Sequence, residues 1–222
     1  MTVTPTIVCV IPVHDDAAHI GLAIDSLLAQ TLPPGRIVVV DDGSTEPIRP
    51  ALARFGPVVE YIRQPRSGPA TARNLGAAGA TEEFIAFLDS DDRYDPARFA
   101  TAVGRMRSDP AVGGTVCLAQ NVDENASPVG DPIPAFTCGA LVVRRTALAT
   151  VGPFDPTLPH GSALQWYIRA REAGVRIEVD EPALLLRLLR PTSMSHTDGC
   201  QSHSEHLAVL RASLQRRRGA SG

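Results

Sequence analysis

The chain reads Phe84-Ile85-Ala86-Phe87-Leu88-Asp89-Ser90-Asp91-Asp92, an apolar run that leads directly into a group of carboxylates. A run of β-prone apolar residues is typical of a buried strand, whereas closely spaced acids repel one another and are poor strand formers. Such acids become tolerable when a cation lies among them, because a hard divalent ion prefers oxygen ligands and cancels their charge. Ligands of open α/β sheets also collect at the carboxyl ends of strands. The stretch therefore predicts a buried strand that ends in a metal–diphosphate site, with a solvated acidic turn as the alternative.

Strands and helices alternate around this stretch. Up to residue 110 we expect strands at 6–12, 36–40, 58–62 and 84–88, and helices at 20–28, 48–55, 69–80 and 97–106. This alternation predicts a parallel sheet with helices on both faces. After residue 110 the rhythm changes, and we expect strands at 112–118, 139–143 and 176–179, an apolar run at 183–189, a polar loop at 121–134 and helices at 144–150, 162–173 and 204–217. We predict a single α/β domain with a mostly parallel twisted sheet and a smaller mixed sheet.

Composition places the chain among ordinary soluble globular proteins. It has 222 residues, of which 44% are hydrophobic and 20% are charged, and its net charge of −3 gives no reason to expect a nucleic-acid partner. No apolar segment approaches the length that spans a membrane, and no signal-like segment begins the chain. The basic cluster at Arg211 and 216–218 is either a solvated helix end or a contact with an anionic membrane surface. We expect a cytoplasmic protein, with a peripheral membrane contact as an option.

The cysteines are scattered through the chain without paired spacing, at Cys9, Cys117, Cys138 and Cys200. Cys9 lies within an expected apolar strand. This pattern favours reduced thiols over a disulfide framework or a zinc site.

Two further motifs lie close to strand ends. Asp41 and Asp42 follow an apolar run and precede Gly43, and a carboxylate there could accept a hydrogen bond from a nucleotide base. The alternative role for Asp42 or Ser44 is a helix N-cap, and the two roles can coexist. Arg73 lies early in the helix expected from Pro69, where an arginine near a helix N-terminus suits a phosphate, although an exposed helical arginine is often only solvated.

These motifs, taken in order, resemble glycosyltransferase family 2. The resemblance covers roughly residues 6–195 and rests on the segments 10–14, 26–31, 39–44, 72–74, 87–92, 143–145, 151–155 and 169–174. It implies an A-type nucleotide-diphospho-sugar transferase fold and a reaction that inverts the anomeric centre of the sugar. It also implies a nucleotide-sugar-binding half at 6–110 and an acceptor-side half with a C-terminal helix at 111–222.

The resemblance implies a role for each matching residue. Nucleotide contacts are expected from Pro12, His14, Asp41, Asp42, Arg73, Asp89 and Ser90. Asp89 and Asp91 form the Asp-x-Asp motif that would hold Mn²⁺ or Mg²⁺, and the ion would assist departure of the nucleoside diphosphate. Gly139 and Ala140 would border the donor sugar. The partners would be a nucleotide diphosphate sugar and a hydroxyl-bearing acceptor, whether a saccharide, a lipid-linked molecule, a peptide or a small molecule.

The chain departs from the family where the general base is expected. An inverting transferase needs a group that takes the proton of the acceptor hydroxyl, and the family carries an acid at the start of a helix after a glycine. Ser162, Ala163 and Gln165 stand there instead, in the acceptor region. His160 is the nearest candidate base, with a merely exposed histidine as the alternative. Other options are an acceptor that needs little deprotonation, a substrate that brings its own base, or a protein that binds the donor without transferring it.

Two more residues carry weaker hypotheses. His196 lies in a segment that resembles the family's late segment and could ligate Mn²⁺, or it could be a surface histidine. Trp166 could stack on an acceptor sugar, although a helical tryptophan is more often part of the core. A nucleotidyltransferase is disfavoured because the stretch Pro12–Asp16 is acidic and has no glycine.

Overall fold

Strand β1 (Ile7–Val13) lies inside the parallel part of the sheet. It pairs in parallel with β2 (Arg36–Asp42) on one side and with β4 (Phe84–Phe87) on the other. Strand β3 (Val59–Gln64) extends this part as the parallel neighbour of β2. The strands β1, β2 and β4 are almost entirely buried, as expected for parallel strands covered on both faces. This computed structural model describes residues 6–190 and 199–220, and in the last helix it describes the side chains of 204–213 and 215.

The second half of the chain adds mixed strands to the same sheet. Strand β8 (Val142–Arg144) joins β4 in antiparallel fashion, and β6 (Val112–Val122) joins β8 in the same way. Strand β9 (Arg176–Leu188) lies parallel to β6 and carries the short strand β5 (Arg93–Tyr94) at its far edge. In the described residues the order is β3-β2-β1-β4-β8-β6-β9-β5, with β7 (Ile133–Pro134) paired to β6. The smaller mixed set of strands is thus continuous with the parallel part.

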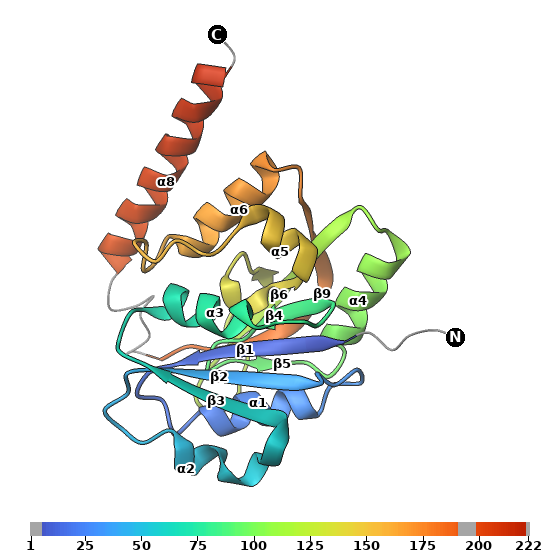
Figure 1. Ribbon diagram of the computed structural model, residues 1–222, viewed down its shortest axis with the longest axis vertical. Helices are drawn as coiled ribbons and strands as arrows, with labels where there is room; N and C mark the ends of the chain where they lie inside the picture. Colours follow the sequence, from blue (N-terminus) through green and yellow to red (C-terminus); the bar gives the residue numbers. More distant parts are fainter. Residues whose placement is uncertain (1–5, 191–198, 221–222) are drawn as a thin grey trace.

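Helices cover both faces of this α/β sheet, as the alternating pattern predicted (Figure 1). Helix α3 (Pro69–Ala78) packs against β1 and β2, while α1 (Ile20–Leu28) and α2 (Arg49–Leu52) lie on the opposite side. Helix α4 (Arg98–Ser108) packs against β6 and β9. The later helices are α5 (Arg145–Val151), α6 (Ser162–Glu172) and α8 (Gly199–Ala220), and α8 leans on α6 and projects from the body.

Several elements begin or end at residues other than those expected from the sequence. The expected strand 139–143 begins as the 3₁₀ turn η2 (Cys138–Ala140), and only Val142–Arg144 is extended. The expected helix 48–55 is the short α2 followed by the 3₁₀ segment η1 (Ala53–Val58), which is interrupted at Gly56. The segments 176–179 and 183–189 form one strand, β9, whose register shifts beside Cys117 and Leu118. Part of the expected loop 121–134 pairs as β7, and the last helix begins at Gly199.

An ion pair is buried between α4 and the mixed strands. Arg98 Nη1 lies 2.9 Å from Asp180 Oδ2, and neither side chain has accessible surface. The guanidinium also donates to the carbonyl oxygens of Thr115 and Ala140. It therefore fixes the 3₁₀ turn 138–140 against β6.

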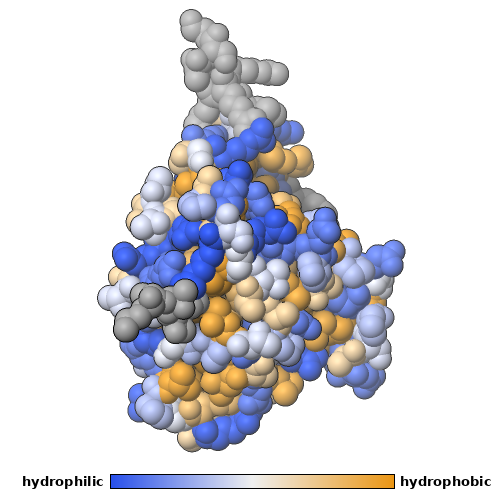
Figure 2. Space-filling view, turned by 90° about the vertical axis from the view of Figure 1, so that its right-hand side faces the viewer, coloured by the Kyte–Doolittle hydropathy of each residue, from blue (hydrophilic) through white to orange (hydrophobic). Residues whose placement is uncertain are grey.

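On the side of the molecule shown in Figure 2, hydrophilic and hydrophobic residues are interspersed over the surface.

Replacing Arg98 with methionine should lower the free energy of unfolding by about 3–5 kcal/mol, because Asp180 then keeps a buried charge with only Arg105 beside it. Urea denaturation measures this loss. The exposed pair of Arg54 and Asp25 supplies the control, and Arg54→Met should cost less than about 1 kcal/mol. Equal costs for the two variants would contradict the structural role of Arg98.

Candidate functional site

The order in which the chain adds strands reverses at β1, because β2 and β3 lie on one side of it and β4 on the other. The predicted acidic motif lies at this switch point. The chain passes from β1 to β2 on one side, while β4 lies on the other. Open α/β sheets bind ligands at the carboxyl ends of the strands beside such a switch point. Residues 14–16 follow β1 and residues 88–92 follow β4, so the topology brings two acidic segments together.

A cluster of carboxylates forms here from these two segments, and a third segment, at the end of β9, donates hydrogen bonds to it. Ser90 Oγ donates to Asp16 Oδ2 across 2.7 Å, which joins the end of β4 to the end of β1. The N–H group of Leu188, at the end of β9, donates to Asp92 Oδ1. Arg190 then reaches Asp91, with Nη2 2.5 Å from its Oδ2. We call Asp16, Asp89, Asp91 and Asp92 the carboxylate cluster.

Asp89 is held between a helix and a turn. Arg73 Nη2, from α3, donates to its Oδ1 across 2.6 Å. On the other side lies Gly139, where an added Cβ would come within 2.9 Å of Asp89 Oδ2. The antiparallel register of β8 on β4 explains this approach, because residues just before β8 must lie beside residues just after β4. Gly139 is therefore needed for its small size.

Burial and neighbouring charges raise the pKa of two members of the cluster. Burial raises the pKa of Asp92 well above its usual value, and the charges of Asp89 and Asp91 raise it further. The pKa of Asp91 is also raised, first by burial and then by Asp89, while Arg190 opposes the shift. Positive charge at Asp91 thus favours its ionised form.

The loops after β1 and β2 form the predicted nucleotide side. His14 Nδ1 lies 3.0 Å from the carbonyl oxygen of Asp42, and Pro12 is buried in β1. The Asp42 carboxylate accepts hydrogen bonds from Gln64 and from the N–H groups of Ser67 and Gly68. Asp42 therefore fixes the turn that precedes α3.

Three predicted contact residues have no accessible surface. The Asp41 carboxylate accepts hydrogen bonds from Ser44, Tyr61 and Arg63. Ala140 lies in the core, and Trp166 packs against Phe154 with its Nε1–H donated to the carbonyl oxygen of Gly152. A side chain that solvent does not reach cannot contact a ligand unless the core opens. In this conformation Asp41 and Ala140 are covered by the protein, and Trp166 belongs to the core, which is the alternative that the sequence offered for it. The expected ligand contacts of Asp41, Ala140 and Trp166 stay predictions.

A pair of hydrogen bonds joins the motif at 72–74 to the motif at 151–155. Asn74 Nδ2 donates to the carbonyl oxygen of Phe154, and the N–H group of Phe154 donates to Asn74 Oδ1. The pair joins α3, which carries Arg73, to the turn before α6. It gives the motif residues Asn74 and Phe154 a structural role.

The residues expected near the base position lie at the start of α6. Ser162 is buried, and Ala163 is half-buried and packs against the hydrophobic core. The N–H groups of His160 and Gly161 both donate to Glu205 Oε2 of α8, each across 3.0 Å. An acid therefore does lie at this helix start, but it comes from a different helix. His196 falls outside the described residues.

The donor set suits a hard divalent cation. Asp89 and Asp91 supply carboxylate oxygens at a strand end, and Mg²⁺ in particular is often held by one or two carboxylates together with substrate phosphates and water. The guanidinium on Asp91 also marks a position where the protein accepts positive charge. Over residues 6–190 and the described part of α8, however, no group of three or more histidines, cysteines or acids is arranged around one metal position. The substrate would have to complete the coordination.

Sequence reasoning missed four contributors: Asp16, Tyr94, Arg190 and Glu205. The hydroxyl of Tyr94 donates to the carbonyl oxygens of Phe87 and Gly139, which ties β4 to the 138–140 turn. Asp16 stands in the acidic stretch after the first strand, so its position alone could have suggested a role. Arg190 and Glu205 come from distant segments, and only the tertiary fold places them.

A groove of about 770 Å³ lies between α6, α8 and the beginning of β9. One face of α6 lines it, with Leu164, Tyr167, Ile168 and Arg171 at helical spacing, and Phe136 also contributes to the lining. The Tyr167 hydroxyl donates to the carbonyl oxygen of Thr137, two residues before Gly139. The groove therefore lies beside the turn that contacts Asp89.

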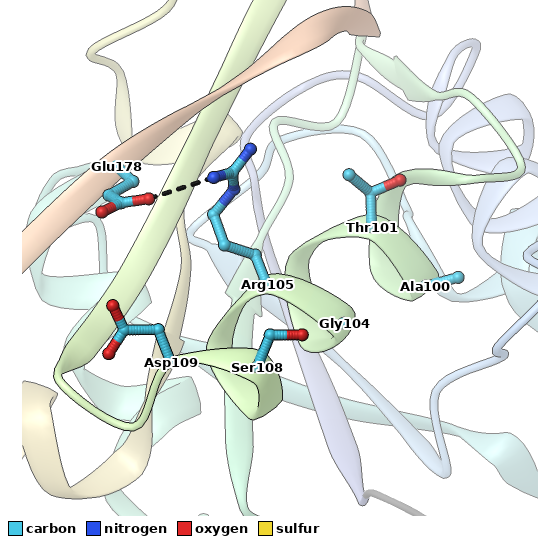
Figure 3. A pocket seen from close by; sticks show the side chains of 7 residues that line it. All are labelled: Ala100, Thr101, Gly104, Arg105, Ser108, Asp109 and Glu178. Atoms are coloured by element: carbon cyan, nitrogen blue, oxygen red, sulfur yellow. Dashed lines mark hydrogen bonds and ion pairs between the residues drawn. The ribbon is translucent and has the colours of Figure 1, made fainter.

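A second depression of about 430 Å³ lies on α4 and the start of β9 (Figure 3). It contains an ion pair between Arg105 and Glu178, with a nitrogen–oxygen distance of 3.2 Å. It is lined by Ala100, Thr101, Gly104, Arg105, Ser108, Asp109 and Glu178. None of the predicted site residues is among them.

Three of the four cysteines lie where the structure describes side chains. Cys9, Cys117 and Cys138 are free and buried, as the sequence predicted for reduced cysteines. Burial raises the pKa of the Cys138 thiol to about 11, so it is not a thiolate near neutral pH. Within the described segments, none of the helices has both the length and the apolar character needed to cross a bilayer.

Comparisons with known proteins agree with the sequence motifs. The family profile of glycosyl transferase family 2 matches residues 8–146. The pre-mycofactocin glycosyltransferase of Mycobacterium tuberculosis is 29% identical over 199 residues, which cover 79% of this chain and 41% of that protein. The succinoglycan biosynthesis protein ExoW of Rhizobium meliloti is 40% identical over 90 residues, or 38% of this chain and 28% of ExoW. The chain thus spans about two fifths of the length of the mycobacterial protein and less than a third of the length of ExoW.

Solved structures share the fold at low sequence identity. The mannosyltransferase PcManGT from Pyrobaculum calidifontis, in complex with GDP-Man and Mn²⁺, has a TM-score of 0.75 and 20% identity, covering 97% of this chain and 65% of that one. S. aureus TarS 1-349, in complex with UDP-GlcNAc, has a TM-score of 0.74 and 18% identity, covering 86% of this chain and 61% of that one. The architecture is therefore the A-type glycosyltransferase fold.

Replacing Asp92 with asparagine should stabilise the metal-free protein at neutral pH. The raised pKa means that the folded protein keeps the Asp92 proton at pH values where the unfolded chain has released it. The folded state then binds more protons, so the contribution of Asp92 to the free energy of unfolding falls as the pH rises above the ordinary carboxyl pKa of about 3.9. Asparagine removes this loss while its side-chain oxygen can still accept the Leu188 N–H.

Urea unfolding at pH 5 and pH 8 measures the difference between wild type and Asp92→Asn, which should widen at the higher pH. Asp25→Asn changes an exposed carboxylate and should leave the difference flat. A stability gap for Asp92→Asn that stays constant across this range would show that the carboxyl titrates normally.

Proposed function

The chain belongs to glycosyltransferase family 2, and from this premise we propose that it transfers a sugar from a nucleotide diphosphate donor to a hydroxyl acceptor with inversion. The observation that carries the proposal is the Asp-x-Asp motif at the switch point of the sheet, with Asp89 and Asp91 at the end of β4. PcManGT and TarS, which share the fold, are described with GDP-Man and with UDP-GlcNAc. Their ligands support a nucleotide sugar as the donor class.

Different loops of the chain would contact different parts of the donor. His14 and the turn held by Asp42 would border the base, since both lie at the ends of β1 and β2. Asp89 and Asp91 would hold Mn²⁺ or Mg²⁺ on the diphosphate, and the bound ion would neutralise the charge that develops on the leaving group. Arg73 orients Asp89, and Gly139 leaves room beside it.

The acceptor would approach from the groove between α6 and α8. Its hydroxyl oxygen would form a bond to the anomeric carbon as the bond from that carbon to the diphosphate oxygen breaks. The hydroxyl proton must pass to a base, and His160 and Glu205 at the start of α6 are the candidates on this side.

A second candidate function rests on the same helix start. Positions 162, 163 and 165 hold serine, alanine and glutamine, so the first turn of α6 carries no acid of its own that could take the proton. A protein that binds the nucleotide sugar but transfers it slowly or not at all would have this composition. Donor binding is common to both candidates, and turnover separates them.

Donor binding should require both a divalent cation and Asp91. A thermal-shift screen of uridine and guanosine diphosphates should raise the melting temperature only when Mn²⁺ or Mg²⁺ is present, because a ligand of the folded state stabilises it by mass action. Asp91→Asn should abolish the shift. Asp109→Asn, an exposed carboxylate paired with Arg176, should retain it. An equal shift without any cation would refute the assigned role of the Asp-x-Asp motif.

Ala163→Asp should raise the rate of donor hydrolysis or transfer by about tenfold or more, because a general base contributes factors of that order and above. Release of nucleoside diphosphate measures the rate. Ala163→Asn is the matched control, similar in size but unable to accept the proton, and it should not raise the rate. Fast turnover of the wild type that survives both His160→Ala and Glu205→Gln would leave the proposed base candidates without support.

A further inference from the structure

Arg190 bridges two carboxylates of the cluster. Its Nη2 lies 2.5 Å from Asp91 Oδ2, and its Nη1 lies 3.2 Å from Asp16 Oδ1. The residue stands just beyond β9, which is fixed at this point by the hydrogen bond from Leu188 to Asp92. The guanidinium is thus placed by the sheet, and its exposed fraction is only 22%.

The guanidinium occupies one oxygen of the Asp91 carboxylate, the group that a cation at the Asp-x-Asp motif would use. An arginine and a divalent ion both seek the charge of Asp91, and two cations at one carboxylate repel each other. The guanidinium lies against Asp91 and Asp16 at once, so it faces two of the cluster's negative charges. Arg190 therefore supplies part of the positive charge that the cluster needs when no ion is bound.

Asp16 gives the guanidinium a second anchor that a cation at Asp91 need not disturb. This carboxylate is almost fully buried and is held by Ser90 Oγ at 2.7 Å and His19 Nδ1 at 2.5 Å. An Arg190 displaced from Asp91 would remain beside the site through Asp16. Its freed N–H groups would then face the negative charge of an incoming nucleotide diphosphate.

We infer that Arg190 is an exchangeable counter-cation: it competes with the divalent ion for Asp91 and yields when a nucleotide diphosphate arrives to pair with it. This inference rests on the proposed function, because it takes Asp91 as the cation ligand. Its consequence is that binding of cation and nucleotide is coupled. The ion alone binds weakly, since it must displace Arg190, whereas nucleotide gives the displaced guanidinium a new partner.

Mn²⁺ binding to the full 222-residue chain tests the inference, with free Mn²⁺ measured by electron paramagnetic resonance. Without nucleotide, Arg190→Gln should bind Mn²⁺ about tenfold more tightly than wild type, a factor typical of coupled sites. The extra tightening caused by a nucleoside diphosphate should shrink in the variant. Arg190→Lys keeps the charge but cannot bridge both acids, and it should lie between the two.

Arg176→Gln removes an arginine from an exposed ion pair with Asp109 and should bind Mn²⁺ like wild type. Equal Mn²⁺ affinity of wild type and Arg190→Gln, in variants with unchanged circular dichroism, would overturn the inference and leave the proposed function intact. Failure of every variant to bind Mn²⁺, even with uridine or guanosine diphosphate, would overturn both. A third outcome is that Arg190→Gln loses nucleotide binding and that Mn²⁺ has no effect on nucleotide binding in either protein. Arg190 would then take the place of the metal, and the inferred exchange between Arg190 and the cation would be wrong.

Discussion

Electrostatic repulsion among the four acids of the carboxylate cluster is the constraint on which the rest of the site depends. Asp16, Asp89, Asp91 and Asp92 meet where β1 and β4 end, and burial makes their mutual repulsion stronger than it would be in water. Two arginines from distant segments, Arg73 and Arg190, relieve part of it. Burial and neighbouring charges raise the pKa of Asp92, and the other acids are paired with arginines, which is an arrangement that a divalent cation can improve.

The framework that assembles these charges is the register of the sheet. Pairing of β8 with β4 sets the 138–140 turn against Asp89, and pairing of β9 with β5 carries Arg190 to Asp91. The buried pair of Arg98 and Asp180 holds the same turn from behind. Substitutions far from the cluster should therefore act on it by moving these contacts.

The first half of the fold was predictable because its signals are local. The buried strands, the Ala-rich helix with Arg73 and the acids at Asp89 and Asp91 each follow from periodicity or from charge at a strand end. The sequence could not reveal that β8 adds to β4 in antiparallel fashion, or that Asp41 faces inward toward Tyr61. Those outcomes depend on pairings between residues far apart in the chain. The same limit hid Glu205, which reaches the start of α6 from a different helix.

The central claim is that a divalent cation on Asp91 bridges the protein to a nucleotide diphosphate. A crystal grown with Mn²⁺ and either uridine or guanosine diphosphate, measured for the anomalous scattering of manganese, tests it most directly. We expect one anomalous peak bonded to the Asp91 carboxylate and to the diphosphate, with the guanidinium of Arg190 moved off Asp91. A bound nucleotide with no manganese at the end of β4, and Arg190 still on Asp91, would contradict it.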